Sequence, residues 1–163
     1  MSWAALSTIV DLLGAIAVLV TLVYLAVQTR QNANALRANT RQAILSSDQA
    51  FLQSIRDDPD LELFRFKPEL TAREKIRVGF LFLTFTRMRE NNWFQYTNGG
   101  LDHATWQSYR RSVVAMFATP NGMRWWRNSS SSGMWDSAFV SMVNELIADA
   151  QVLTESRYLK IFE

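Results

Sequence analysis

The sequence predicts an all-α protein: an N-terminal transmembrane helix that continues into a long helix beyond the membrane, followed by a compact helical bundle. Residues 12–27 carry no charge. No proline and only one glycine, Gly14, lie between residues 3 and 57, so nothing interrupts a helix over this length. The remainder shows helix caps and stops and no alternating strand pattern. The expected parts are an anchor over 1–28, an extension over 29–56 and a bundle over 57–163 that packs on the extension.

The composition excludes several classes of protein. The chain has 163 residues, which corresponds to one domain, and its 48% hydrophobic and 20% charged residues are unlike those of a disordered tail. A net charge of +2 gives no general attraction to nucleic acid, so no nucleic-acid partner is expected. The absence of cysteine and the single histidine exclude disulfides, thiol catalysis and the common zinc and iron–sulfur sites. We therefore expect no cofactor and no metal centre.

The N-terminal apolar stretch is long enough to cross a membrane. From Trp3 to Val27 a helix would extend ~37 Å, more than the ~30 Å of a hydrocarbon core. Trp3 and Tyr24 would lie ~31 Å apart along it and suit the two membrane interfaces. No basic segment precedes the stretch and no small-x-small cleavage site follows it, which favours a retained anchor over a signal peptide. The alternative, an apolar core helix of a soluble domain, would need neighbours that surround it, and the other helices have ordinary amphipathicity.

Basic residues follow the apolar stretch and none precede it. The first 27 residues contain no Lys or Arg, whereas Arg30, Arg37 and Arg41 come directly afterwards. The positive-inside rule therefore predicts a single-pass protein whose long helical extension and bundle are cytoplasmic. Each arginine near anionic lipid contributes about 1 kcal/mol of binding. With Trp3 and Tyr24, these arginines are the expected membrane-surface anchors.

One face of the long helix is small or polar. Alternate steps of three and four residues place on it Ser7, Asp11, Gly14, Thr21, Gln28, Asn32 and Asn39. Lipid gives no hydrophobic drive for association, so membrane helices contact one another where small residues allow close approach and polar residues pair. This polar stripe predicts contact with a second copy or with another membrane protein. Two alternatives stay open: a water-lined pore in a homo-oligomer, and a chance arrangement.

Asp11 is the one ionisable residue within the apolar stretch. It lies eight residues after Trp3, or ~12 Å along a helix. An acid at such a depth is by default a candidate functional residue that needs a partner or water. The alternative is that Asp11 reaches the outer interface through a tilted helix in a thinned bilayer.

Start and stop signals divide the bundle into helices. Thr71 and Glu74 form a capping-box pattern, Asp102 is a typical N-cap, and the Pro59 segment ends the long helix. The signals place helices at residues 72–97, 103–118, around 123–126 and 135–153, a helical turn at 61–66, a break at 119–122 and a flexible serine loop at 129–133.

The bundle offers little support for catalysis. Five of the six tryptophans lie in it, and core packing explains them better than a ligand cage. Glu90 is expected to be half-buried against Arg87 or an arginine elsewhere; a structural pair explains it better than a ligand site, which stays the alternative. His103 follows Asp102, but neighbouring residues on a helix point to different faces, so helix capping explains Asp102 better than a catalytic pair does. No catalytic residue is expected.

The junction between anchor and extension carries a resemblance to a known family. The stretch VYLAVQTRQNANALRA covers residues 23–38, and its matching residues are Tyr24, Leu25, Ala26, Gln28, Arg30, Gln31 and Asn32. It resembles the membrane exit of a widespread, uncharacterised family of small bacterial proteins with an N-terminal transmembrane helix and a Trp-rich helical remainder. The Trp125-Trp126 pair after a Pro-Asn-Gly turn is similar as well. The resemblance implies a bacterial source and the same architecture, and it implies no activity.

The expected function is that of a non-enzymatic, single-pass protein of a bacterial inner membrane. Its partners would be membrane lipid and a second copy or another membrane protein, with the cytoplasmic helices acting as an assembly or interaction module. The alternatives are a small cation-conducting oligomeric pore lined by the polar stripe and an accessory subunit of a larger membrane complex. An enzyme acting on lipid or a soluble metabolite ranks last.

Overall fold

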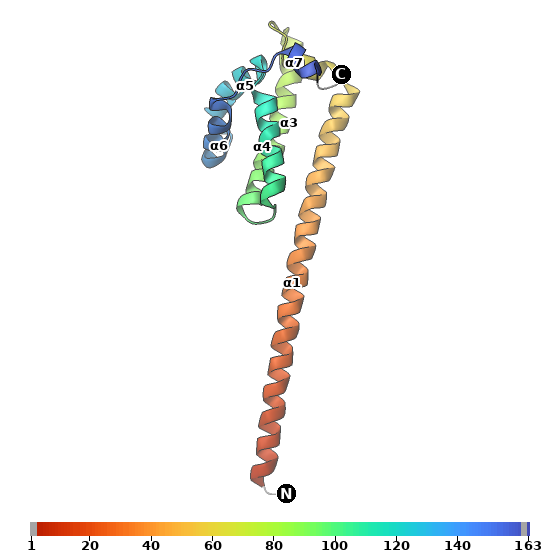
Figure 1. Ribbon diagram of the computed structural model, residues 1–163, viewed down its shortest axis with the longest axis vertical. Helices are drawn as coiled ribbons and strands as arrows, with labels where there is room; N and C mark the ends of the chain where they lie inside the picture. The colour runs from red at the N-terminus through yellow and green to blue at the C-terminus, as the bar shows by residue number, and fades with distance from the viewer. Residues whose placement is uncertain (1–2, 161–162) are drawn as a thin grey trace. The chain divides into compact units, whose positions relative to one another are not determined.

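The computed structural model describes residues 3–160 and residue 163, apart from the side chains of residues 4–10 (Figure 1). Over this part the chain is helical and has no strand, which confirms the all-α class. The helices are α1 (Trp3–Asp57), α2 (Asp60–Leu63), α3 (Ala72–Thr97), α4 (His103–Phe117), α5 (Pro120–Ser130), α6 (Ser137–Ala148) and α7 (Glu155–Leu159).

The long N-terminal helix is a single element, as the sequence predicted. Helix α1 has 55 residues and runs without interruption to Asp57 (Figure 1). It ends where Asp58 precedes Pro59, because proline disfavours a helical conformation in the residue before it. The chain forms two compact units, residues 1–39 and residues 40–163, so the last part of α1 belongs to the unit that holds the bundle.

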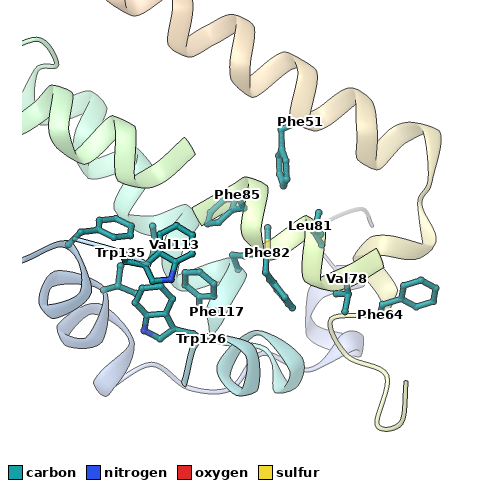
Figure 2. Packing of buried hydrophobic residues seen from close by; sticks show 13 residues of the cluster. Phe51, Phe64, Val78, Leu81, Phe82, Phe85, Val113, Phe117, Trp126 and Trp135 are labelled. Atoms are coloured by element: carbon teal, nitrogen blue, oxygen red, sulfur yellow. The ribbon is translucent and has the colours of Figure 1, made fainter. Parts of the chain in front are cut away.

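An aromatic core holds the second unit together. Phe82 from α3, Phe117 from α4 and Trp126 from α5 are almost fully buried, and Figure 2 shows them gathered with Phe85 and Trp135. The ring centroids of Phe117 and Trp126 are 5.1 Å apart. Such pairs add about 0.5–1.5 kcal/mol beyond the burial of their area. The tryptophans therefore serve the core, as expected.

A second, smaller cluster lies under the last part of α1. It consists of three buried residues: Ile44 from α1, Leu101 from the loop before α4, and Trp106 from α4. Phe51 lies further along α1, and Figure 2 shows its ring directed toward Phe85. The two ring centroids are 5.8 Å apart. The end of α1 thus packs on the bundle through alternate turns of one face.

The predicted caps of α3 and α4 are confirmed. The backbone N–H of Glu74 donates to Thr71 Oγ1, and the Glu74 carboxylate accepts from the Thr71 backbone N–H at 2.8 Å. Gly99 then takes a positive φ of 73°, which suits glycine and ends the helix. Asp102 accepts from the Thr105 backbone N–H at 2.9 Å and starts α4.

The predicted break at residues 119–122 does separate α4, which ends at Phe117, from a following helix, but that helix, α5, begins earlier than expected, at Pro120. Thr119 caps the helix by accepting from the backbone N–H of Gly122, and Pro120 is the first helical residue. Proline is favoured there because the missing N–H would have no partner in any case. Gly122 is required, since a Cβ there would lie 2.5 Å from the Met116 carbonyl oxygen. A Thr-Pro pair therefore opened a helix where the sequence suggested only a turn.

The serine segment and the last helix also differ from expectation. Ser129 and Ser130 belong to α5, and the buried Ser129 hydroxyl accepts from the Trp135 indole N–H at 2.8 Å. Helix α6 ends at Ala148, short of the predicted end at Leu153. Thr154 then caps the separate helix α7. Side-chain hydrogen bonds thus order a segment that its composition marked as a flexible loop.

Candidate functional site

The polar stripe is exposed in the first unit. The side chains of Asp11, Gly14, Thr21, Gln28, Asn32 and Asn39 are all exposed, and that of Ser7 lies outside the described part of the chain. A Cβ placed on Gly14 would meet nothing within 4 Å. The Thr21 hydroxyl donates to the Ala17 carbonyl at 2.8 Å, so its proton is already engaged. The helix brings these residues together along one face, and that face is open to a partner.

The expected membrane-surface residues are exposed as well. Trp3 is 88% exposed and Tyr24 63% exposed, and the side chains of Arg30 and Arg37 are open to solvent. Arg41 belongs to the second unit. Hydrogen bonds from Thr105 lower the pKa of Asp102, and the charge of Arg41 adds a smaller effect in the same direction.

In the second unit, one face of α1 packs on the bundle and another stays open. Ile44 and Phe51 are buried and Asp48 is half-buried on the packed face. The polar stripe continues on the exposed side with Gln42, Ser46, Gln49 and Gln53. The stripe is thus small or polar from Gln28 to Gln53, although Leu36, Leu45 and Leu52 are also exposed on α1.

Asp48 joins α1 to the bundle through a partly buried network. Arg89 Nη2 donates to Asp48 Oδ1 at 2.9 Å, and the Tyr109 hydroxyl donates to Asp48 Oδ2 at 3.0 Å. The guanidinium of Arg89 lies over the rings of Tyr109 and Phe85, at 4.5 and 4.9 Å from their centroids. Among the described residues, Arg89 Nε has no hydrogen-bond acceptor, and the two ring faces compensate part of that loss. Burial and the bond to Asp48 raise the pKa of Tyr109.

A second cluster repeats this arrangement with other residues. Arg65 Nη1 pairs with Glu62 and Nη2 donates to the Ala115 carbonyl at 2.6 Å. The Tyr158 hydroxyl donates to Glu62 Oε2 at 2.8 Å. Burial and the hydrogen bond to Glu62 raise the pKa of Tyr158 to about 12. The cluster therefore ties the segment after α2 to α4 and to α7.

A cavity of about 350 Å³ lies between the two clusters. It is lined by their charged side chains and by apolar residues that include Phe51, Ile55, Phe85 and Met116. Each arginine already has its carboxylate, so the charges of the lining cancel. The cavity has the size of a small-molecule site, but its ion pairs fasten α1, the α2 segment and α7 to the bundle. We assign it a structural role.

Sequence reasoning did not find either cluster. Asp48 and Arg89 are 41 residues apart, and Glu62 and Tyr158 are 96 residues apart. The one available signal was Asp48 itself, an acid on the helix face that carries Ile44 and Phe51. Such a position favours a buried partner, but nothing in the spacing identifies Arg89.

The residues considered for chemistry have partners within the bundle. Glu90 is 6% exposed, pairs with Arg87 at 2.8 Å and accepts from the Asp136 backbone N–H, which confirms the predicted structural pairing. The two ring nitrogens of His103 lie 3.1 Å from the Tyr96 hydroxyl and from the Gln107 amide. Among the described residues, no group of three His, Asp or Glu side chains is placed to hold a metal ion.

Comparison of the chain with protein-family models, with curated proteins and with solved structures finds no match. The fold therefore defines only a class: an all-helical chain with one N-terminal helix that is long and apolar enough to cross a membrane.

Proposed function

We propose that this chain is a non-enzymatic, single-pass membrane protein whose helical C-terminal unit acts as an assembly module within a homo-oligomer. One observation carries the proposal. The apolar 18-residue window of α1 has a mean hydropathy of 2.2, and none of it is buried against the rest of the chain. A core helix of a soluble protein is mostly buried, whereas an anchor has lipid around it.

Charge and sequence support the orientation. Arginines 30, 37 and 41 follow the apolar stretch directly, and the stretch itself has no basic residue. Basic residues collect on the cytoplasmic side of a membrane helix, so the bundle lies in the cytoplasm under this proposal. The resemblance at residues 23–38 adds a bacterial inner membrane as the location.

The open polar stripe supports self-association. Asp11 and Thr21 place polar groups in the apolar stretch, and Gly14 leaves space for a neighbouring backbone. A second copy brings the same residues, so small residues approach one another and polar groups pair across the contact. The same face would form the contact in the pore and accessory-subunit alternatives. Assembly state separates the accessory subunit from the two homo-oligomers, and ion current separates the pore from the assembly module.

Native mass spectrometry of the full chain, extracted in a mild detergent, tests this proposal. A discrete homo-oligomer is expected. A monomer at every detergent concentration would contradict self-association, and a mixed complex with another protein would favour the accessory-subunit alternative.

A further inference from the structure

A second open surface lies on the bundle, between α3 and α5. It is a groove of about 480 Å³, and Ile76, Gly79, Phe80 and Leu83 from α3 line it together with Trp125 from α5. Ile76 is 62% exposed and Phe80 is 63% exposed, one helical turn apart on the same helix. Two large apolar side chains so exposed at one place mark an interaction site.

Gly79 gives the groove a feature that the chain itself does not use. A glycine inside a helix costs about 1 kcal/mol relative to alanine. A Cβ at Gly79 would meet no heavy atom within 4 Å, so packing within the described chain does not require glycine there. The missing side chain instead leaves a depression in the surface beside Ile76 and Phe80. A helix of a partner can approach the α3 backbone closely at this point.

The rim of the groove is basic. Lys75 lines it, and Arg124 lines an adjoining cavity that shares Lys75, Trp125 and Asn128 with the groove. Lys75 and Arg124 are exposed, and neither pairs with an acid among the described residues. None of the described residues that line the groove is acidic. A partner helix that fits this groove must therefore carry an acidic residue and must have small side chains on the face that approaches α3.

Helix α6 of a second copy has both properties. Its exposed residues Ala138, Ser141, Glu145 and Ala148 follow one another at helical spacing, and three of the four are small. Residues 134–150 contain three acids and no Lys or Arg. The exposed Glu145 can pair with Lys75 and Arg124, which have no acidic partner among the described residues. The small residues leave room for the side chain of Phe80 and allow close approach to the α3 backbone at Gly79.

We propose that the α3–α5 groove of one copy receives the outer face of α6 from a second copy. This inference rests on the proposed homo-oligomer and names the contact between its bundles. The two surfaces differ, so the contact is head-to-tail, and repeated head-to-tail contacts close into a ring where the rotation allows.

Because the chain has no cysteine, site-directed crosslinking tests the contact directly. The full-length variants Phe80→Cys and Ser141→Cys carry different tags, are co-expressed, and are treated in membranes with a short bismaleimide crosslinker. The expected result is a crosslinked dimer that contains both tags when the variants are co-expressed, and no crosslinked dimer of either kind when one variant is expressed alone. Ser108→Cys, exposed on α4, replaces Phe80→Cys as the control and should give no mixed dimer with Ser141→Cys.

The outcomes distinguish this inference from the proposal on which it rests. An oligomer by native mass spectrometry without the crosslink between positions 80 and 141 would overturn the groove contact alone. A monomeric wild-type chain would overturn the homo-oligomer itself.

Added to Ser141→Cys, Glu145→Lys should reduce the crosslink yield about tenfold, because like charges then face each other. Lys75→Glu in the partner copy should restore it, and an unchanged yield in Glu145→Lys would contradict the charge match.

Discussion

At the residue scale, Asp48 is the side chain whose loss should harm the fold most clearly. Asp48→Ala leaves the buried Arg89 guanidinium without its carboxylate and Tyr109 without its acceptor. Removing one partner of such a pair costs about 3 kcal/mol. Thermal unfolding of the detergent-solubilised full chain should show a clearly lower midpoint. Gln49→Ala, exposed on the same helix, should change stability by less than about 0.5 kcal/mol, and equal midpoints for both variants would contradict the role of Asp48.

Glu74 should make stability depend on acid pH. The hydrogen bond from Lys67 at 2.6 Å, with help from the Thr71 backbone, lowers the pKa of Glu74 from 4.5 to about 2. Because the folded pKa lies below the unfolded value, the ionised carboxylate stabilises the fold above pH 4.5. That stabilisation disappears as the pH falls from 4.5 toward 2.

Glu74→Gln should therefore unfold at a lower temperature than the wild type at neutral pH, and the difference should shrink between pH 4.5 and pH 2. Unfolding midpoints measured across this window provide the test, with the exposed Glu69→Gln as the matched control. A difference that stays constant with pH would show that the charge of Glu74 does not contribute.

The roles of single residues were predictable where the partner is near in sequence. Asp102 and Glu90 have partners three residues away, at Thr105 and Arg87, and helical spacing alone brings such pairs together. The partner of Asp48 comes from another helix, 41 residues later, and only tertiary packing selects it. The polar stripe could likewise be predicted, because its residues recur at helical spacing within one helix. The groove between α3 and α5 could not, because it forms only when these helices pack together.

At the element scale, capping residues and prolines predicted where helices begin and end. Errors arose where proline can either end one helix or begin the next. Proline at residue 59 ended α1 as predicted. Proline at residue 120, preceded by Thr119, instead began α5, because a threonine N-cap turns a helix breaker into a first helical residue. The helix predicted for residues 135–153 is shorter in the structure, where α6 spans Ser137–Ala148. Thr154 caps the separate helix α7, which lies beyond the predicted range.

The polar stripe of α1 has a test at the same scale. Gly14→Leu should disrupt the oligomer, because a leucine at the closest approach keeps two backbones apart. Ile16→Leu, on another side of the helix, should leave assembly unchanged because the two side chains suit lipid equally well. Native mass spectrometry of the two variants gives the comparison. Equal effects from both would refute the stripe as the contact face.

At the scale of the whole molecule, conduction of cations across a membrane distinguishes a pore from an assembly module. Asp11 is exposed within the apolar stretch, and a ring of such carboxylates would attract cations if the centre were wet. Under our proposal, the purified wild-type chain passes no cation current in planar bilayers, and Asp11→Asn changes neither current nor oligomer size. A reproducible cation current that is smaller in Asp11→Asn would favour the pore.

The central claim is that α1 anchors the chain in a membrane and leaves the bundle in the cytoplasm. Since the chain has no cysteine, Ala104→Cys on the exposed surface of α4 provides one reactive site. The most direct measurement, made in a bacterial host, labels this cysteine with a membrane-impermeant maleimide in sealed inverted vesicles and in spheroplasts. A separate membrane sample is washed with alkaline carbonate. The account predicts that the protein stays in the membrane pellet and is labelled in inverted vesicles but not in intact spheroplasts. Release by carbonate, or labelling in intact spheroplasts, would contradict it.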